Sequence, residues 1–195
     1  MHRICVFSGS SIGVRPEYRA AAAALGKELV AHNLGLVYGG ASVGLMGAIA
    51  DAVLAEGGEA IGIIPHSLSQ REIAHPNLTA LHEVESMHER KALMSDLSDG
   101  FIALPGGYGT FDELFEVTTW AQLRLHTKPI GLLNVANYFA PLLALVQHAV
   151  QEGFIQPKYT HLLLSYENPA ELLEALTTYT PPHDQFTWTD QPPER

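Results

Sequence analysis

Residues 100–113 read GFIALPGGYGTFDE, and this stretch decides the fold class. An unbroken apolar run at residues 101–104 stops at Pro105, and a glycine-rich turn precedes a helical pattern that begins at Thr110. An apolar run without polar alternation is typical of a strand that is buried on both faces of a parallel sheet. The stretch therefore predicts a strand, a tight turn and a helix in succession.

Strand-like and helix-like segments alternate along the rest of the chain in the same way. Short apolar runs predict strands at residues 3–7, 34–38, 60–64, 81–84, 100–104, 130–133 and 161–164. Longer segments with helical patterning predict helices at residues 17–32, 43–55, 87–97, 110–125, 138–152 and 170–177. This alternation indicates an α/β fold, namely a Rossmann-like, doubly wound parallel sheet with helices on both faces.

The length and composition of the chain indicate one domain. With 195 residues, of which 47% are hydrophobic, the chain can bury one substantial core but not two. We expect this single domain to span residues 1–180. Residues 181–195 are polar and rich in proline, so we expect them to form a loose tail.

Charge and cysteine content restrict the partners and the compartment. The formal net charge is -10, which should repel nucleic acids and anionic membranes, so we expect neither as a partner. The sequence contains no apolar run as long as a membrane span and no signal-peptide pattern at its N-terminus. Cys5 is the single cysteine, which excludes an intramolecular disulfide and favours a reducing cytoplasm.

Three predicted strands end in turns of small residues, at residues 8–11, 39–40 and 105–110. In an open parallel sheet these turns share one edge, which is where ligands bind. The third turn leads into a helix at Thr110, whose amides and hydroxyl can face a phosphate. A lone glycine pair would more simply be a tight turn without a ligand. The first turn lacks the GxGxxG pattern, so a dinucleotide is not expected.

Charged residues occur on the predicted helix that follows the third turn and on the predicted helix that precedes it in the sequence. Glu113 follows Thr110 by one helical turn, where its carboxylate can either approach a bound sugar phosphate or simply favour the helix dipole. Arg90 and Lys91 lie near the start of a helix, where cations oppose the dipole. An anionic ligand would explain them, although a charge cluster is more often a solvated face. The scattered histidines lack the spacing of metal ligands, so no metal is expected.

Two motifs together carry a family resemblance. SMHERKA at residues 86–92 and PGGYGTFDE at residues 105–113 resemble the Lonely Guy family of cytokinin-activating phosphoribohydrolases, whose mark is PGGxGTxxE. The likeness extends from FSGSS at residues 7–11 through VYGGASVGLMG at residues 37–47 to KPIGLLN at residues 128–134. It is lost in the proline-rich tail.

The resemblance implies an activity. It implies hydrolysis of the N-glycosidic bond of adenosine-type (cytokinin riboside) 5′-monophosphates to free base and ribose 5-phosphate, with no cofactor. It also implies a homodimer, which apolar Phe111, Leu114, Phe115 and Trp120 on one helix favour as well. Relatives often carry the label lysine decarboxylase, but nothing in this sequence resembles a lysine anchor for pyridoxal phosphate.

The resemblance also implies roles for individual residues. Arg90 and Glu113 match the catalytic pair of the family. The residues that match its substrate-binding positions are Glu72, Arg90, Lys91, Gly106, Gly107, Tyr108, Gly109, Thr110, Glu113 and Thr119. Asp112 stands where the family more usually has Glu, a change that we expect to matter little.

The chemistry of glycosidic cleavage suits this pair, but two alternatives remain open. Cleavage builds positive charge on the ribose, which the Glu113 carboxylate can stabilise while it holds the ribose hydroxyls or orients water. Arg90 stays protonated and can clamp the substrate or stabilise the departing base. The alternatives are a general nucleosidase for AMP and nucleotide salvage, and a binding protein of the same fold that holds a nucleotide or a molybdopterin-type cofactor without turnover.

Overall fold

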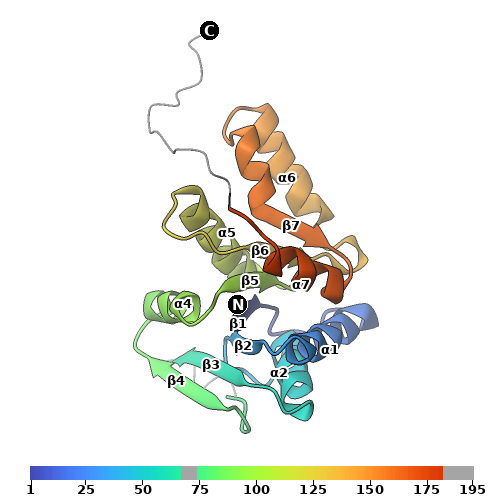
Figure 1. The fold of residues 1–195 in the computed structure, drawn as a ribbon, viewed down its shortest axis with the longest axis vertical. Coiled ribbons are helices and arrows are strands. Elements are labelled where there is room, and N and C mark those ends of the chain that lie inside the picture. The colour runs from blue at the N-terminus through green and yellow to red at the C-terminus, as the bar shows by residue number, and fades with distance from the viewer. Residues whose placement is uncertain (67–73, 182–195) are drawn as a thin grey trace.

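A seven-stranded parallel sheet forms the centre of the computed structural model, which describes residues 1–66 and 74–181 (Figure 1). In spatial order its strands are β4 (Ala80–Val84), β3 (Ala60–Pro65), β2 (Gly35–Tyr38), β1 (Arg3–Phe7), β5 (Gly100–Ala103), β6 (Ile130–Leu133) and β7 (Leu163–Tyr166). Every neighbouring pair is parallel. The α/β, doubly wound fold predicted from the sequence is confirmed.

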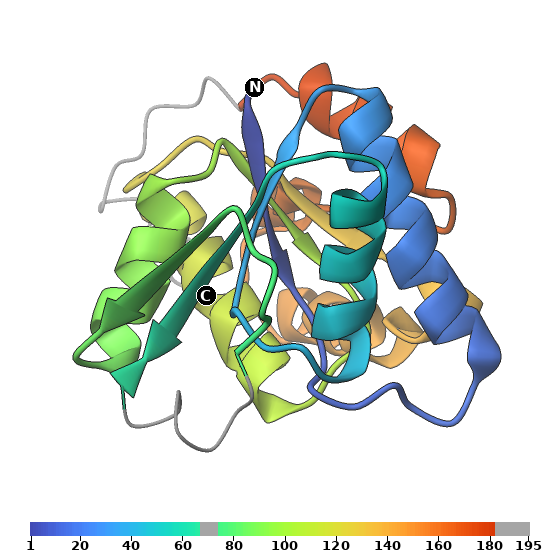
Figure 2. The ribbon, with the colours of Figure 1, turned by 90° about the horizontal axis from the view of Figure 1, so that it is seen from below.

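Helices cover both faces of the sheet (Figure 2). One layer contains α1 (Pro16–Ala31), α2 (Gly44–Ala55) and α7 (Pro169–Thr177), and the other contains α4 (Met87–Asp96), α5 (Tyr108–Gln122) and α6 (Ala140–Gln151). Two short 3₁₀ helices, η1 (Val135–Asn137) and η2 (Pro157–Leu162), connect elements of the second half. Among these described elements, no helix is both long and apolar enough to cross a bilayer.

The strand sequences explain why both faces are buried. Along β1, Ile4 and Val6 belong to the core under α1 and α2, whereas Cys5 and Phe7 belong to the core under α4 and α5. Successive side chains of a strand point to opposite faces, so a strand between two helical layers needs apolar residues at every position. This is why the central strands read as unbroken apolar runs.

Some element boundaries differ from the sequence-based prediction. The strand predicted at residues 161–164 starts later, as β7, because the preceding segment from Pro157 to Leu162 winds into η2. The helix predicted from Thr110 begins two residues earlier, at Tyr108. The expected domain boundary at residue 180 stays a prediction, since residues 182–195 lie outside the described part of the chain.

The strand order places a crevice between β1 and β5. The chain runs outward from β1 to β4 on one side and then returns to build β5, β6 and β7 on the other. The loops after β1 and β5 therefore diverge at their carboxyl ends, which is where open α/β sheets bind ligands. These two loops contain the first and third of the predicted turns, at residues 8–11 and 105–110.

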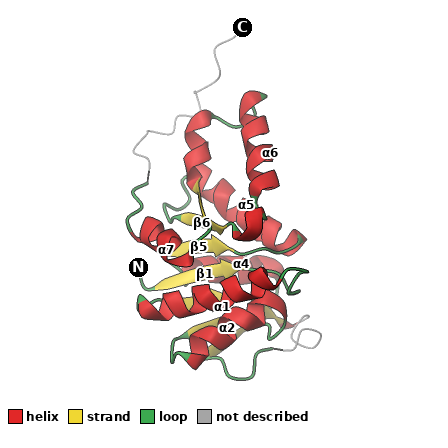
Figure 3. Cartoon of the chain, turned by 90° about the vertical axis from the view of Figure 1, so that its right-hand side faces the viewer, coloured by secondary structure: helices red, strands yellow, loops and turns green. Residues whose placement is uncertain are grey.

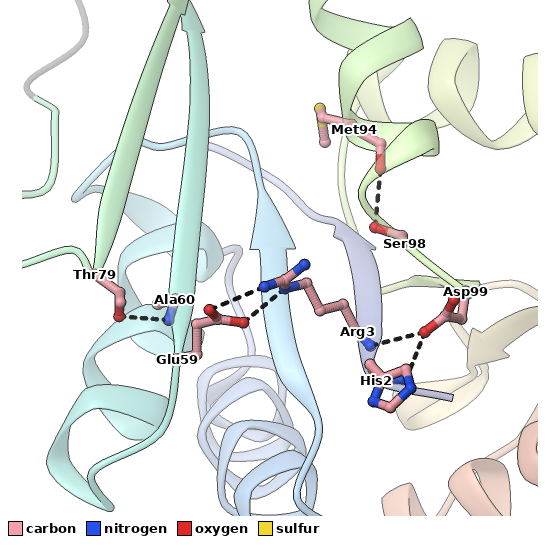
Figure 4. Close-up of polar contacts among 8 residues, drawn as sticks. All are labelled: His2, Arg3, Glu59, Ala60, Thr79, Met94, Ser98 and Asp99. Carbon is pink, nitrogen blue, oxygen red and sulfur yellow. Dashed lines mark hydrogen bonds and ion pairs between the residues drawn. The ribbon is translucent and has the colours of Figure 1, made fainter.

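Polar contacts join the amino ends of β1, β3 and β5, which lie opposite the crevice (Figure 4). Arg3, at the start of β1, donates to both carboxylate oxygens of Glu59, just before β3, at 2.7 and 3.1 Å. Asp99, just before β5, accepts hydrogen bonds from the backbone N–H groups of His2 and Arg3 at 2.5 and 3.1 Å. The hydrogen bond from Arg3 holds the pKa of Glu59 below its usual value. The polar groups at the amino ends of these strands, remote from the crevice, are thus well paired.

Candidate active site

A cleft of about 220 Å³ opens beyond the carboxyl ends of β1 and β5. Three predicted turns and the starts of three helices contribute to its walls. The described residues that line it are Val6, Ser8, Gly9, Ser10, Gly39, Met46, Met87, Arg90, Gly107, Tyr108, Gly109, Thr110, Asp112 and Glu113. Segments that lie far apart in the sequence therefore meet at the point where the strand order reverses.

The start of α5 lines the cleft, and its first backbone N–H groups have no partner among the described residues. Gly107 is the N-cap residue, so the first helical positions are Tyr108, Gly109 and Thr110 rather than residues beyond Thr110. The first amide to bond back is that of Phe111, to the Gly107 carbonyl at 3.1 Å. Amides in a first helical turn lack partners within the helix and carry the positive end of its dipole. This geometry suits an anionic group such as a phosphate.

The reason for glycine differs among the three glycine positions of this turn. A Cβ atom at Gly106 would lie 2.0 Å from Thr110 Oγ1 and 2.9 Å from the Gly9 nitrogen, so packing requires glycine there. A Cβ atom at Gly107 or Gly109 would meet no described atom within 4 Å. Packing does not require glycine at these two positions, which leaves close approach of a ligand to the backbone as a reason for it.

Arg90 is buried beside the cleft without a full set of acceptors. Its side chain leaves α4 and passes Gly39, where a Cβ atom would lie 2.2 Å from Nη2. No described residue accepts a hydrogen bond from Arg90 Nε, and Nη1 reaches only the sulfur of Met87, at 3.7 Å. The Ser8 hydroxyl on the facing wall also lacks a partner among the described residues. Buried polar groups without partners cost free energy, so a polar ligand would stabilise this cleft.

Glu113 faces Arg90 across the same cleft. The distance from Arg90 Nη2 to Glu113 Oε1 is 3.7 Å, too long for a hydrogen bond, and the two residues are 8% and 7% exposed. Burial raises the pKa of Glu113 to about 7, and the Arg90 guanidinium acts in the opposite direction. The structure thus brings together the two residues that the sequence marked as a catalytic pair, and their loose contact leaves room for groups of a ligand.

Lys91 is not among the residues that line the cleft, although it follows Arg90 directly. Its Nζ lies 3.1 Å from Asp112 Oδ2 and 3.0 Å from Glu116 Oε1, both on α5. Burial opposes the charge of Lys91, but the hydrogen bonds to these two carboxylates outweigh it and raise the pKa of the amine. Lys91 therefore ties α4 to α5.

Three other predicted substrate contacts are absent from the described lining of this cleft, and one of them, Gly106, instead lines a neighbouring groove. Thr119 lies farther along α5 on its exposed side, where its hydroxyl donates to the Phe115 carbonyl at 2.7 Å. Glu72 lies outside the described residues. Conversely, Met46 and Met87 line the cleft and were not singled out from the sequence. The only sequence signal for them is their position inside the stretches VYGGASVGLMG and SMHERKA.

Comparisons with known proteins bear on the family of this chain rather than on individual residues of the cleft. A family model described as possible lysine decarboxylase matches residues 46–176. A cytokinin riboside 5′-monophosphate phosphoribohydrolase of Arabidopsis thaliana is 51% identical over 183 residues, which are 94% of this chain and 86% of that protein. A probable enzyme of the same name from Oryza sativa subsp. japonica is 52% identical over 94% of this chain and 75% of its own length. This chain belongs to the cytokinin riboside 5′-monophosphate phosphoribohydrolase family.

Solved structures share the fold of this phosphoribohydrolase family member at much lower identity. The molybdenum cofactor binding protein from Rippkaea orientalis is 22% identical, with a TM-score of 0.66 over 91% of this chain and 96% of that chain. The Moco carrier protein from Chlamydomonas reinhardtii is 19% identical, with a TM-score of 0.67 over 90% and 95%. At such identities the likeness shows the fold alone, so function has to be argued from the cleft.

The first prediction concerns the activity of Glu113. A carboxylate that stabilises positive charge on ribose must be ionised, so kcat/KM for a nucleoside 5′-monophosphate should rise with pH through about 7, the pKa of Glu113 in the folded protein. Glu113→Gln should abolish most turnover at every pH while the far-UV circular dichroism stays native. Near-normal activity in this folded variant would remove Glu113 from the reaction.

The stability of the same variant gives an independent check. The folded-state pKa of Glu113, about 7, lies above its ordinary 4.5, so the folded protein binds this proton more tightly than the unfolded chain does. Stability should therefore fall as pH rises between these two values. Glutamine carries no such charge, so Glu113→Gln should be more stable than the wild type by on the order of 2–3 kcal/mol at about pH 8, with the difference vanishing near pH 4. Urea denaturation at both pH values measures this, and a difference independent of pH would contradict the raised pKa.

The second prediction separates Arg90 from Lys91. Adjacent residues on a helix point roughly 100° apart, and here one faces the cleft while the other is bound by two carboxylates. Arg90→Lys loses the planar fork of donors and should lower kcat by about 100-fold. Lys91→Arg keeps a cation between the carboxylates and should retain much more activity. Steady-state kinetics on both variants decides, and equal losses would refute the division of roles.

Proposed function

We propose that this chain hydrolyses the N-glycosidic bond of adenosine-type 5′-monophosphates, cytokinin riboside 5′-monophosphates included, and releases the free base and ribose 5-phosphate. The observation that carries the proposal is the buried, loosely paired Arg90 and Glu113 beside the free amides at the start of α5. Relatives that are about half identical over most of the chain are named for this activity. The fold alone would not distinguish it from other functions.

Each part of such a substrate has a matching group in the cleft. The amides of Tyr108, Gly109 and Thr110 receive the 5′-phosphate. The ribose then lies toward Glu113, whose carboxylate stabilises the positive charge that develops on the sugar and orients the attacking water. Arg90, with an unpaired Nε, donates to the leaving base or to the sugar hydroxyls. Water adds to the anomeric carbon, and the base leaves with the bonding electron pair and a proton.

A non-catalytic carrier of the same fold fits the cleft less well. A site that only holds an anion gains nothing from a buried carboxylate, since Glu113 would repel the ligand whenever it is ionised. A carboxylate whose pKa is about 7, next to a phosphate-type turn, is instead typical of a residue that takes part in chemistry. The molybdenum cofactor proteins of similar fold are only about 20% identical to this chain.

Lysine decarboxylation also fits the cleft poorly. Enzymes that use pyridoxal phosphate bind it through a Schiff base to a lysine. The cleft is lined by an arginine but by no lysine of the described segments, and the nearby Lys91 is held by Asp112 and Glu116. The label of the matching family model therefore does not extend to this chain.

The third prediction concerns the phosphate and the base. Because several charge-assisted hydrogen bonds hold the phosphate, kcat/KM should be at least about 100-fold higher for AMP than for adenosine. Chromatography of free bases from AMP, isopentenyl-AMP, GMP and CMP distinguishes a cytokinin-producing enzyme, which prefers isopentenyl-AMP, from a general salvage nucleosidase, which favours plain AMP. Equal efficiency on adenosine and AMP would remove the phosphate site. If no base were released from any of these nucleotides, the protein would instead be a carrier that binds its ligand without turnover.

The fourth prediction is that the protein is a homodimer. The apolar surface that supports a dimer in the structure differs in part from the surface that the sequence suggested. Leu114 is fully buried in the monomer core rather than at an interface. However, α6 has no buried residue and lies at the end of the molecule farthest from α1 and α2 (Figures 1 and 3). Leu145 on α6 is 59% exposed, and Leu125 and Phe154 are 69% and 86% exposed. These exposed apolar side chains and the uncovered helix α6 are what supports the proposed interface.

Light scattering at micromolar concentration should give twice the monomer mass of 21.2 kDa. Leu145→Glu should shift the protein toward the monomer, because a charge cannot be buried unpaired at the interface. Val14→Glu is the matched control, since Val14 is 96% exposed but lies in the loop before α1. A wild-type protein of monomer mass would refute the dimer, and an equal effect of both variants would place the interface elsewhere.

The remaining expectations stay predictions. The cytoplasmic compartment rests on the single cysteine, Cys5, which is buried and free in the structure. The expectations of no metal, no cofactor, no nucleic acid and no membrane partner rest on residue spacing and on the acidic composition.

A further inference from the structure

Two successive carbonyl groups of the turn after β5 are held by neighbouring segments. The Pro105 carbonyl accepts a hydrogen bond from the Gly9 N–H at 3.1 Å. The Gly106 carbonyl accepts a short hydrogen bond from the hydroxyl of Tyr138, which directly follows η1 at the end of β6. The turn that precedes α5 is therefore fixed from β1 on one side and from the β6–α6 connection on the other.

The bond from Tyr138 determines which way the next amide points. The described peptide bonds are all trans, so the C=O and N–H of one peptide unit point in opposite directions. Tyr138 lines a separate groove of about 280 Å³ together with Tyr18 and Leu45, whereas Gly107 borders both this groove and the catalytic cleft. Because the Gly106 carbonyl points to Tyr138 on the groove side, the Gly107 N–H points to the cleft side.

The turn has little restraint of its own against rotation of this peptide. Neither Gly106 nor Gly107 has a side chain, and glycine pairs reach many backbone conformations. A side chain cannot be added at Gly106, where a Cβ atom would collide with Thr110 Oγ1. A Cβ atom at Gly107 would contact nothing described within 4 Å. The orienting contact must therefore come from outside the turn, and the Tyr138 hydroxyl supplies it.

The segment that presents Tyr138 adopts an unfavourable backbone. Ala136 and Asn137, consecutive residues, have φ values of 51° and 60°, in the left-handed region, which asparagine tolerates but alanine adopts at a cost. The surrounding bonds hold this conformation, since Asn134 Oδ1 accepts from the Phe139 N–H at 2.7 Å. Strained backbone that is held in this way is often found at functional sites. This segment follows the KPIGLLN stretch of residues 128–134, and neither contains a residue of the proposed catalytic pair.

We propose that Tyr138 is a positioning residue for the substrate phosphate: its hydroxyl holds the Gly106 carbonyl so that the Gly107 N–H is presented to the 5′-phosphate. Tyr138 lies in the neighbouring groove and acts through the backbone of the turn. The inference rests on the proposed function for the identity of the ligand. The proposal extends the phosphate site beyond the amides of the first turn of α5 to the amide of its N-cap residue, Gly107.

Tyr138→Phe tests the proposal, because phenylalanine keeps the edge-on packing against the rings of Tyr18 and Phe139 and loses only the hydroxyl. The loss of one orienting hydrogen bond should weaken ribose 5-phosphate binding by about five- to tenfold in calorimetry. The KM for AMP should rise by a similar factor with kcat within about twofold, and inhibition by adenine, which has no phosphate, should be unchanged. The melting temperature verifies that the variant is folded.

Tyr18→Phe is the matched control, since it removes a hydroxyl from the same pair of rings and leaves the bond between Tyr138 and Gly106 in place. It should bind ribose 5-phosphate as the wild type does. Unchanged ribose 5-phosphate binding in Tyr138→Phe, or equal weakening of ribose 5-phosphate and adenine, would overturn the proposal. A wild-type protein that binds ribose 5-phosphate in a Tyr138-dependent way but releases no base from AMP would instead refute the hydrolase and leave the positioning role standing.

Discussion

The hydrogen bond from the Gly9 N–H to the Pro105 carbonyl, 3.1 Å long, joins the two loops between which the cleft forms. Gly9 also accepts a bond from the Leu45 N–H at 3.0 Å, so one residue connects the ends of β1 and β5 with the start of α2. A Cβ atom at Gly9 would lie 3.2 Å from the Gly106 Cα atom, which leaves little space for a side chain. Glycine at both positions where the loops meet allows the phosphate-type turn to lie this close to β1.

The two ends of the strands differ in how fully their polar groups are paired. At the amino ends of the strands, Arg3 pairs with Glu59 and Asp99 accepts backbone N–H groups, so charges that the fold brings together are compensated. At the carboxyl ends of the strands, Arg90 and Glu113 are buried but 3.7 Å apart, and Arg90 Nε has no hydrogen-bond partner among the described residues. Such a site lowers the stability of the free protein in exchange for groups that can act on a ligand. This difference between the two ends of the strands supports the proposed site without reference to any relative.

The sequence predicted what depends on local pattern and missed what depends on contacts between distant segments. Unbroken apolar runs and glycine turns gave the sheet and its ligand-binding edge, because burial on both faces leaves a direct trace in the residues. The approach of Arg90 to Glu113 came only from the family resemblance, since nothing local to α4 or α5 encodes it. The role inferred for Tyr138 had no sequence signal, because it depends on a side chain reaching a carbonyl on another loop. The start of α5 was misplaced because a glycine N-cap gives no side-chain capping signal.

The acidity of the chain poses an electrostatic problem that Lys91 helps to solve. A protein with a net charge of -10 has to admit a phosphate next to Glu113, and Asp112 and Glu116 lie on the same helix as that residue. Both carboxylates contribute to the raised pKa of Glu113, and Lys91 acts against them while it bridges the two at 3.1 and 3.0 Å. Its charge offsets theirs near the cleft, so the positive end of α5 and the Arg90 guanidinium set the local potential that a phosphate meets. Adjacent cations on one helix thus have two different roles: Arg90 lines the cleft itself, and Lys91 neutralises carboxylates that would repel a phosphate.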